Sequence, residues 1–331
     1  MPHFHIEIIP QYKENDVIAG RLLNSINSQA NVDFNDIFIT IINDKSDVLL
    51  SDKLFSKYPN LNINYLINDN NTGPGIARRF GIERTEHDYI MFMDCDDVLY
   101  DKNTLYIVTS CIEDTKPDLL ITNIIKEVNI NNEIKYVLKR KEETYPWLHG
   151  KVFKRELLDK NNICFHNNLR HLEDSYFWTC VIGVIDYKKI IYLDFPSYVW
   201  KLNNNSITRK KNDYEYIVTC FNDYYNCPFY AYDYLCKHNS NIKDLYLIRA
   251  IFDIYLILNS NYYEFEELKD EKNNYLLRLK DDIKKNINIY DNYKKEELED
   301  IFNKEIIKEK NKNNNMVINK SFNDFYNMYL N

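Results

Sequence analysis

Short apolar runs alternate with amphipathic segments through the first half of the chain. Residues 16–29 place Val17, Leu22 and Ile26 near one face of a helix, whereas residues 37–42 are apolar without alternation, as in a strand covered on both faces. Further strand-like runs occupy residues 4–10, 63–67 and 89–93, and a short helical pattern occupies residues 75–84. This alternation predicts an α/β domain with a mainly parallel central sheet and helices on both faces.

The pattern changes in the second half of the chain. It predicts paired strands at residues 118–130 and 134–140 and two helices at residues 150–162 and 172–185. A further strand is predicted at residues 188–195. From Tyr214 onward the spacing of apolar residues is helical. We therefore expect two domains, residues 1–212 and residues 213–331. For the helical region we consider two roles, acceptor binding and self-association into a homo-oligomer.

Composition and charge narrow the class of protein. The 331 residues carry a formal net charge of -8, which argues against a protein that coats nucleic acid through clustered basic residues. No apolar run approaches the ~18 residues of a membrane span, and the N-terminus does not resemble a signal peptide. The seven cysteines are odd in number and have no C-x-x-C spacing. We expect a cytoplasmic protein, with attachment to the inner membrane face as an alternative, and no transmembrane segment.

Acidic residues follow the strand-like run at 89–93. Asp94, Asp96 and Asp97 lie within four positions, where their charges repel one another. A divalent cation would neutralise a D-x-D pair, and Mg²⁺ or Mn²⁺ prefers oxygen ligands. The alternative is that these acids cap the following helix. The buried strand before them favours the metal site, with Asp94 and Asp96 as ligands and the role of Asp97 open.

Two other motifs carry candidate chemistry. A glycine-rich turn with Gly73 and Gly75 precedes Arg78, and its backbone amides suit an anion or the edge of a base. Glu173 and Asp174 begin an apolar helix. One interpretation is that both acids interact favourably with the helix dipole, as acids at a helix start commonly do. The other is that one of them acts as a general base.

Seven motifs in this order resemble glycosyltransferase family 2, whose domain has the Rossmann-like GT-A fold. They cover roughly residues 4–210 and read IIPQYKEN, INDKSD, NTGPGIARRFG, YIMFMDCDD, WLHGKVFKRELL, LEDSYF and YVWKLNNNSITR. The resemblance implies an enzyme that transfers a sugar from a nucleotide sugar, usually UDP-linked, with inversion at the anomeric carbon. It also implies Mn²⁺ or Mg²⁺ as cofactor.

The resemblance implies roles for individual residues. Asp174 matches the catalytic base with Glu173 beside it, and Asp94 and Asp96 match the acids that contact the metal, the ribose and the diphosphate. The remaining positions expected to bind the nucleotide sugar are Pro10, Tyr12, Glu14, Asp44, Gly73, Arg78 and His149. For His149 the alternatives are metal coordination and a satisfied polar residue at a helix start. Lys45 stands where the family has glycine, which predicts a different backbone at this turn.

We expect a metal-dependent inverting glycosyltransferase of surface-glycan synthesis, with a glycan or lipid-linked acceptor. One alternative is glucosylation of a hydroxymethylated DNA base, for which residues 201–211 and the tyrosine-rich tail would supply the nucleic-acid surface. The other is an inactive nucleotide-sugar-binding protein. The intact Asp94, Asp96 and Asp174 argue against it.

Overall fold

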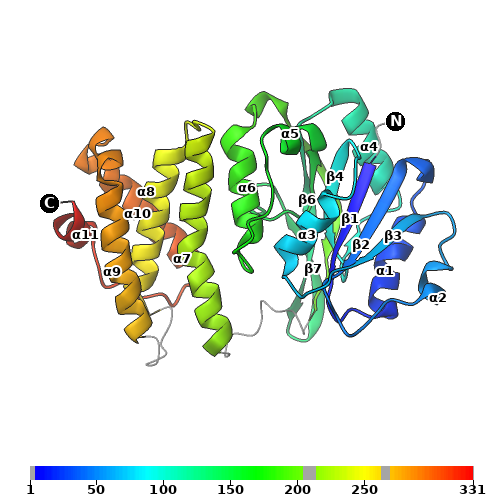
Figure 1. Ribbon diagram of the computed structural model, residues 1–331, viewed down its shortest axis with the longest axis horizontal. Coiled ribbons are helices and arrows are strands. Elements are labelled where there is room, and N and C mark those ends of the chain that lie inside the picture. Colours follow the sequence, from blue (N-terminus) through cyan, green and yellow to red (C-terminus); the bar gives the residue numbers. More distant parts are fainter. Residues whose placement is uncertain (1–3, 204–213, 262–268, 331) are drawn as a thin grey trace. The chain divides into compact units, whose positions relative to one another are not determined.

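The computed structural model describes residues 4–203, 214–261 and 269–330, in two compact units. The units are Met1–Asp223, coloured blue to yellow-green in Figure 1, and Tyr224–Asn331. The predicted boundary at 212 lies N-terminal to this division. Most of the loop predicted at 201–211 lies outside the described residues. No described helix is both long and apolar enough to cross a membrane.

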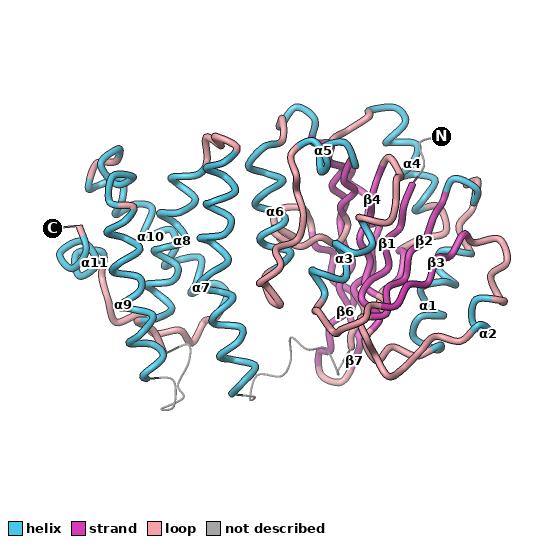
Figure 2. The backbone as a smooth tube through the Cα atoms, viewed as in Figure 1, coloured by secondary structure: helices cyan, strands magenta, loops and turns pink. Residues whose placement is uncertain are grey.

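The first unit has a mixed sheet with helices around it (Figure 2). Its strands are β1 (Phe4–Gln11), β2 (Ile37–Asn43), β3 (Asn62–Ile67), β4 (Tyr89–Asp94), β5 (Val98–Leu99), β6 (Leu119–Ile130), β7 (Glu133–Lys139), β8 (Lys151–Lys154) and β9 (Ile190–Trp200). Its helices are α1 (Asp16–Asn27), α2 (Asp52–Phe55), α3 (Pro74–Ile82), α4 (Thr104–Thr115), α5 (Arg155–Lys160) and α6 (Glu173–Val184), and α7 (Tyr214–Lys237) begins in it.

The strand order places the loops after β1 and β4 side by side. The order is β3-β2-β1-β4-β8-β6-β9-β5, with β7 paired to β6. Strands β1 to β4 are parallel, as predicted, whereas β8 runs antiparallel to both β4 and β6. The order reverses between β1 and β4, and ligands of such sheets bind beyond the carboxyl ends of the strands at this point.

Strand β4 is buried on both faces, which fixes the position of its carboxyl end. Met91 and Met93 belong to the core that includes residues of α1 and α4. Phe92 points to the other face, where its ring packs edge-on against Phe177 of α6 at 5.7 Å. This alternation explains why the strand is apolar along its whole length.

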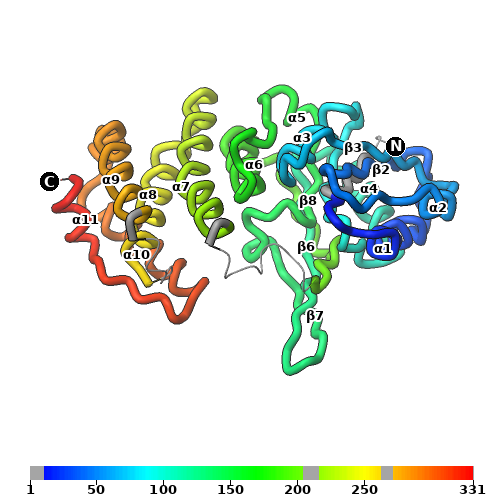
Figure 3. The backbone as a smooth tube through the Cα atoms, turned by 60° about the horizontal axis from the view of Figure 1, so that its bottom comes forward, coloured from blue at the N-terminus to red at the C-terminus, as the bar shows by residue number. Residues whose placement is uncertain are grey.

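The prediction of one helix over residues 150–162 was wrong. Its first part is the strand β8, and the helix α5 begins at Arg155. Val152 and Phe153 are buried and pair with both β4 and β6, so tertiary pairing outweighs the helical pattern. The hairpin of β6 and β7, predicted from its two strand-like runs, projects from the sheet in Figure 3.

The second unit consists of helices in its described part. They are α8 (Lys243–Leu258), α9 (Lys269–Lys285), α10 (Lys295–Lys312) and α11 (Phe322–Tyr329), with the C-terminal part of α7. Phe252 of α8 packs edge-on against Phe302 of α10 and Phe325 of α11. The aromatic residues of the tail therefore form a helical core here.

Replacing Gly75 with Ala should destabilise the first unit by about 1–3 kcal/mol, because overpacking forces neighbouring atoms to move. A Cβ at Gly75 would lie 2.9 Å from Cβ of Glu173, at the contact between α3 and α6. Gly20→Ala is the control, since its Cβ would lie at an ordinary 3.4 Å from Leu54. Urea unfolding measures both, and equal stability of the two variants would contradict this packing.

Candidate active site

The loops that follow β1 and β4 bring several acids together. Burial, with smaller contributions from the charges of Asp96 and Asp94, raises the pKa of Glu14 to about 7. The backbone N–H of Tyr12 donates to Glu14 Oε2 at 2.6 Å. The structure therefore gathers Glu14 of the first loop with the acids after β4, as the strand order requires. Pro10 belongs to β1, and Tyr12 is 38% exposed.

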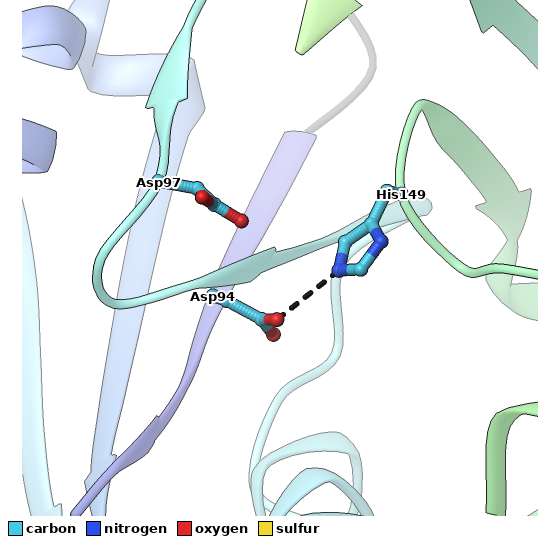
Figure 4. Close-up of side chains that lie close together, drawn as sticks. All are labelled: Asp94, Asp97 and His149. Carbon is cyan, nitrogen blue, oxygen red and sulfur yellow. Dashed lines mark hydrogen bonds and ion pairs between the residues drawn. The ribbon is translucent and has the colours of Figure 1, made fainter. Parts of the chain in front are cut away.

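Asp94, the last residue of β4, is bound from two sides. Arg78 Nη2 donates to its Oδ1 at 3.1 Å, and His149 Nε2 lies 3.1 Å from its Oδ2 (Figure 4). Burial would raise the pKa of Asp94, but His149 and Arg78 outweigh this effect and lower it to about 2. Asp94 is thus an anion at any physiological pH, and it connects α3 to the segment before β8.

Asp97 turns toward Asp94 and His149. Potential ligand atoms of these three residues lie within 4.8 Å of one another (Figure 4). The Tyr198 hydroxyl donates to Asp97 Oδ2, and the Lys201 N–H donates to Oδ1 at 2.7 Å. Burial, with the charges of Asp94 and Asp96, raises the pKa of Asp97 well above its usual range. The short strand β5 follows these acids, so Asp97 does not cap a helix there.

The donor set of Asp94, Asp97 and His149 fits a divalent cation. Two carboxylates and an imidazole are ligands that Mn²⁺ accepts. A cation would also relieve the repulsion that raises the pKa of Asp97. Asp96, which we predicted as a ligand, instead accepts a hydrogen bond from Asn203 Nδ2 at 2.7 Å. The role of Asp96 in metal binding stays a prediction.

Arg78 connects the acids of β4 to the Glu-Asp pair of α6. Its Nη1 donates to Glu173 Oε1 at 2.8 Å, and its side chain is 8% exposed. Burial raises the pKa of Glu173 to about 7, and Asp174 adds to the rise while Arg78 opposes it. Asp174 is half-buried, and its Oδ1 accepts a hydrogen bond from the Ser175 N–H at 2.7 Å. Glu173 is therefore the partner of Arg78, whereas Asp174 is less buried and accepts a backbone hydrogen bond.

Asp44 holds the glycine-rich loop. Its Oδ1 accepts hydrogen bonds from the N–H and hydroxyl of Thr72 and from Asn68, each at 3.0 Å, and its Oδ2 accepts one from Gly73 N–H at 2.8 Å. Gly73 has φ = +87° and precedes α3, the helix that carries Arg78. Asp44 is 2% exposed, so its clearest role is to position this loop. Contact of Asp44 with the nucleotide sugar stays a prediction.

The prediction of a different backbone at Lys45 was wrong. Lys45 adopts φ = +57°, the left-handed region that glycine favours. A non-glycine residue pays roughly 1–2 kcal/mol for this conformation. The contacts of Asp44 with Asn68, Thr72 and Gly73 hold the turn in place despite that cost.

Tyr198 and Lys151 contribute to the site beyond our predicted set. Besides its bond to Asp97, the Tyr198 hydroxyl accepts a hydrogen bond from the Asp94 N–H at 3.2 Å. Lys151 Nζ donates to the carbonyl oxygens of Thr144, at 3.0 Å, and Trp147. Burial lowers the pKa of Lys151 to about 7, while Asp174 opposes the fall. The residues around Lys151 read HGKVFK, and this sequence carries no sign that the lysine is buried.

Comparison with known proteins identifies similar chains. The family model "Glycosyl transferase family 2" matches residues 8–172. Poly(ribitol-phosphate) beta-N-acetylglucosaminyltransferase TarS of Staphylococcus aureus (strain Mu50) is 28% identical over 184 residues, or 51% of this chain and 31% of TarS. Teichoic acid poly(glycerol phosphate) polymerase of Staphylococcus epidermidis is 28% identical over 209 residues, or 58% of this chain and 27% of that protein. The chain thus spans less than a third of these relatives.

Solved structures share the fold. The crystal structure of S. aureus TarS 1–349 has a TM-score of 0.56 and 21% identity, covering 74% of this chain and 69% of that one. The same fragment in complex with UDP has a TM-score of 0.55 and 20% identity, covering 80% and 73%. The first unit therefore has the predicted GT-A fold.

Arg78→Met should lower the free energy of unfolding by about 3–5 kcal/mol, because it leaves the buried carboxylate of Glu173 without its cation and removes one of the two partners of Asp94. The neighbouring Arg79→Met should cost less than ~1 kcal/mol, because Arg79 pairs with the exposed Glu83. Urea unfolding at neutral pH compares the two variants. An Arg78 variant as stable as the Arg79 variant would show that Asp94 and Glu173 do not depend on this guanidinium.

Asp97→Asn should weaken Mn²⁺ binding by at least about tenfold, as loss of a metal-site partner commonly does. Asp96→Asn is the matched control, since Asp96 lies outside the cluster of Asp94, Asp97 and His149. Calorimetric titration with Mn²⁺ alone measures both affinities without any turnover. A larger loss for Asp96→Asn would assign the metal to the D-x-D pair instead.

Proposed function

We propose that this protein transfers a sugar from a UDP-sugar to an acceptor hydroxyl with inversion. The premise is that the chain belongs to glycosyl transferase family 2 over residues 8–172. The observation that carries the proposal is the chain of hydrogen bonds from His149 through Asp94 and Arg78 to Glu173, with Asp174 next to it. It connects the acids at the carboxyl end of β4 with the acids at the start of α6, which supports two separate tasks for them.

The donor end of the site suits a sugar diphosphate. Negative charge grows on the diphosphate as the bond to the sugar breaks, and groups that stabilise this charge lower the barrier. A manganese or magnesium ion held by Asp94, Asp97 and His149 would neutralise part of it. Tyr12, Glu14 and the loop held by Asp44 lie at the strand ends where the nucleotide would bind. A TarS fragment solved with UDP and another with UDP-GlcNAc support a UDP-linked donor.

Asp174 is the general base in this proposal. It would take the proton of the acceptor hydroxyl as that oxygen attacks the anomeric carbon from the face opposite the diphosphate. Glu173 is engaged by Arg78 and holds a raised pKa, so it suits a structural role beside the base. Attack on the opposite face by one activated oxygen gives the inverted product.

The names of two relatives support a class of acceptor. TarS is named for poly(ribitol-phosphate), and the second relative is named as a teichoic acid poly(glycerol phosphate) polymerase. These names support a surface glycan or its lipid-linked precursor as the acceptor, and we propose that the reaction takes place on the cytoplasmic side of the membrane. The helical unit is proposed to bind the acceptor or a second copy of the chain.

Asp174→Asn should lower kcat by about 10²–10⁴-fold with little change in donor binding, because the amide cannot accept the proton. Asp159→Asn, at an exposed pair with Arg155, is the control. UDP release is measured with a panel of UDP-sugars, Mn²⁺ and acceptors that include polyol-phosphate polymer and hydroxymethylated DNA. The anomeric configuration of the product is read by NMR.

The panel separates the proposal from its alternatives. Transfer to the polymer with an inverted product supports it, and transfer to the DNA acceptor would replace the proposed acceptor class. Failure of the wild-type chain to release UDP with any donor would overturn the enzymatic function. Wild-type turnover by Asp174→Asn would remove Asp174 from its role.

A further inference from the structure

One face of α7 contacts the turn that precedes α6. Tyr216, Cys220 and Asp223 are four and three residues apart, so they share a helix face. Asp223 is 3% exposed. Its Oδ2 accepts hydrogen bonds from the N–H groups of Arg170 and His171, at 3.1 and 2.9 Å, and lies 3.0 Å from His171 Nδ1. One carboxylate oxygen thus holds two consecutive backbone amides.

This turn sets the start of the helix that carries Asp174. The residue after His171 is Leu172, which adopts φ = +59° and makes no side-chain capping bond to α6. A left-handed leucine costs roughly 1–2 kcal/mol and persists only where neighbouring contacts impose it. The bonds to Asp223 are such contacts. They fix the backbone three residues ahead of Asp174.

The same turn also contacts the donor side of the site. Arg170 Nη2 donates to Asn71 Oδ1 at 2.6 Å, in the loop that Asp44 holds. The Arg170 side chain also lies against Gly73, where an added Cβ would be 3.6 Å from Nε. A shift of the turn would therefore move a contact of the donor loop together with the start of α6.

We propose that Asp223 is a positioning residue of the reaction, which holds the turn of Arg170, His171 and Leu172 so that Asp174 meets the acceptor hydroxyl. This inference rests on the proposed function for the role of Asp174. It assigns the first half of α7 to the frame of the active site. The hydrogen bonds of Asp223 to the turn can be tested whether or not the donor is known.

The charge of His171 gives the contact a pH signature. Hydrogen bonds from His171 to Asp223 and Cys220 raise its pKa to about 9, against partial opposition by burial. The groups that face His171 are Tyr216, Cys220 and Asp223 from α7, with Arg170 beside it in the chain. The stabilisation is fully present below the unfolded pKa of about 6.5 and is lost as the pH rises through about 9.

The test compares Asp223→Asn and Asp223→Ala with Asp233→Asn, an exposed acid of the same helix. Displacing a catalytic group by about 1 Å can cost ~10²-fold in rate, so we expect kcat to fall about 10–100-fold in Asp223→Ala. KM for the donor should change less than about threefold, because the displaced group is the proposed base for the acceptor hydroxyl. Asp223→Asn keeps an acceptor oxygen and should recover part of the rate.

Two readouts do not depend on activity. Hydrogen exchange of the amides of residues 170–175 should become faster in Asp223→Ala and stay unchanged in Asp233→Asn. The difference in melting temperature between wild type and Asp223→Asn should be largest below pH 6.5 and become smaller above about pH 9, where the backbone hydrogen bonds to Asp223 remain without the charge of His171. Circular dichroism verifies that each variant is folded, and Asp223→Asn serves where Asp223→Ala does not fold.

The outcomes separate the two proposals. Unchanged kcat in both Asp223 variants, with an active wild type, would overturn the positioning role. Unchanged exchange of residues 170–175 would overturn it even for an inactive chain. A wild type without transferase activity, whose exchange nevertheless responds to Asp223→Ala, would contradict the proposed function and leave the anchoring of the turn supported.

Discussion

The buried guanidinium of Arg78 is the interaction on which the site depends. It lies between Asp94 at the end of β4 and Glu173 at the start of α6, so two carboxylates 79 positions apart share one cation. Buried ion pairs of this kind add little net stability over apolar packing, but losing one partner is costly. Arg78 therefore supplies positive charge to both acids from α3, and α3 in turn begins at the loop that Asp44 fixes.

Local pattern predicted the elements whose position depends on their own sequence. The apolar run at 89–93, the helical spacing at 16–29 and the acids after β4 all appear where the spacing placed them. The strand β8 was missed because Val152 and Phe153 precede a good helix-forming stretch, and only pairing with β4 and β6 makes them a strand. These pairing partners lie about 60 and about 30 residues away in the sequence, so a short window of residues cannot reveal them.

The acids after β4 show the same limit at the level of single side chains. Sequence identified Asp94, Asp96 and Asp97 as a group, but which carboxylate turns inward is set by Tyr198 and by the backbone of Lys201, about a hundred residues later. Lys45 shows the converse. A lysine at this position predicted a changed turn, yet the hydrogen bonds of Asp44 impose the left-handed conformation on Lys45. In both places long-range hydrogen bonding overrides the preference of the residue itself.

The antiparallel direction of β8 explains how His149 reaches the acids. Tyr89, Ile90 and Met91 pair with Lys154, Phe153 and Val152, and the same register continued along both chains sets Asp94 opposite His149. A parallel strand beside β4 could contribute to the site only the residues that follow it in the chain. The antiparallel β8 instead contributes residues that precede it, such as His149. The segment that presents His149 is entered from the β6–β7 hairpin and not from a crossover helix. Insertions there can remodel one wall of the site during evolution without shifting the register of the parallel strands.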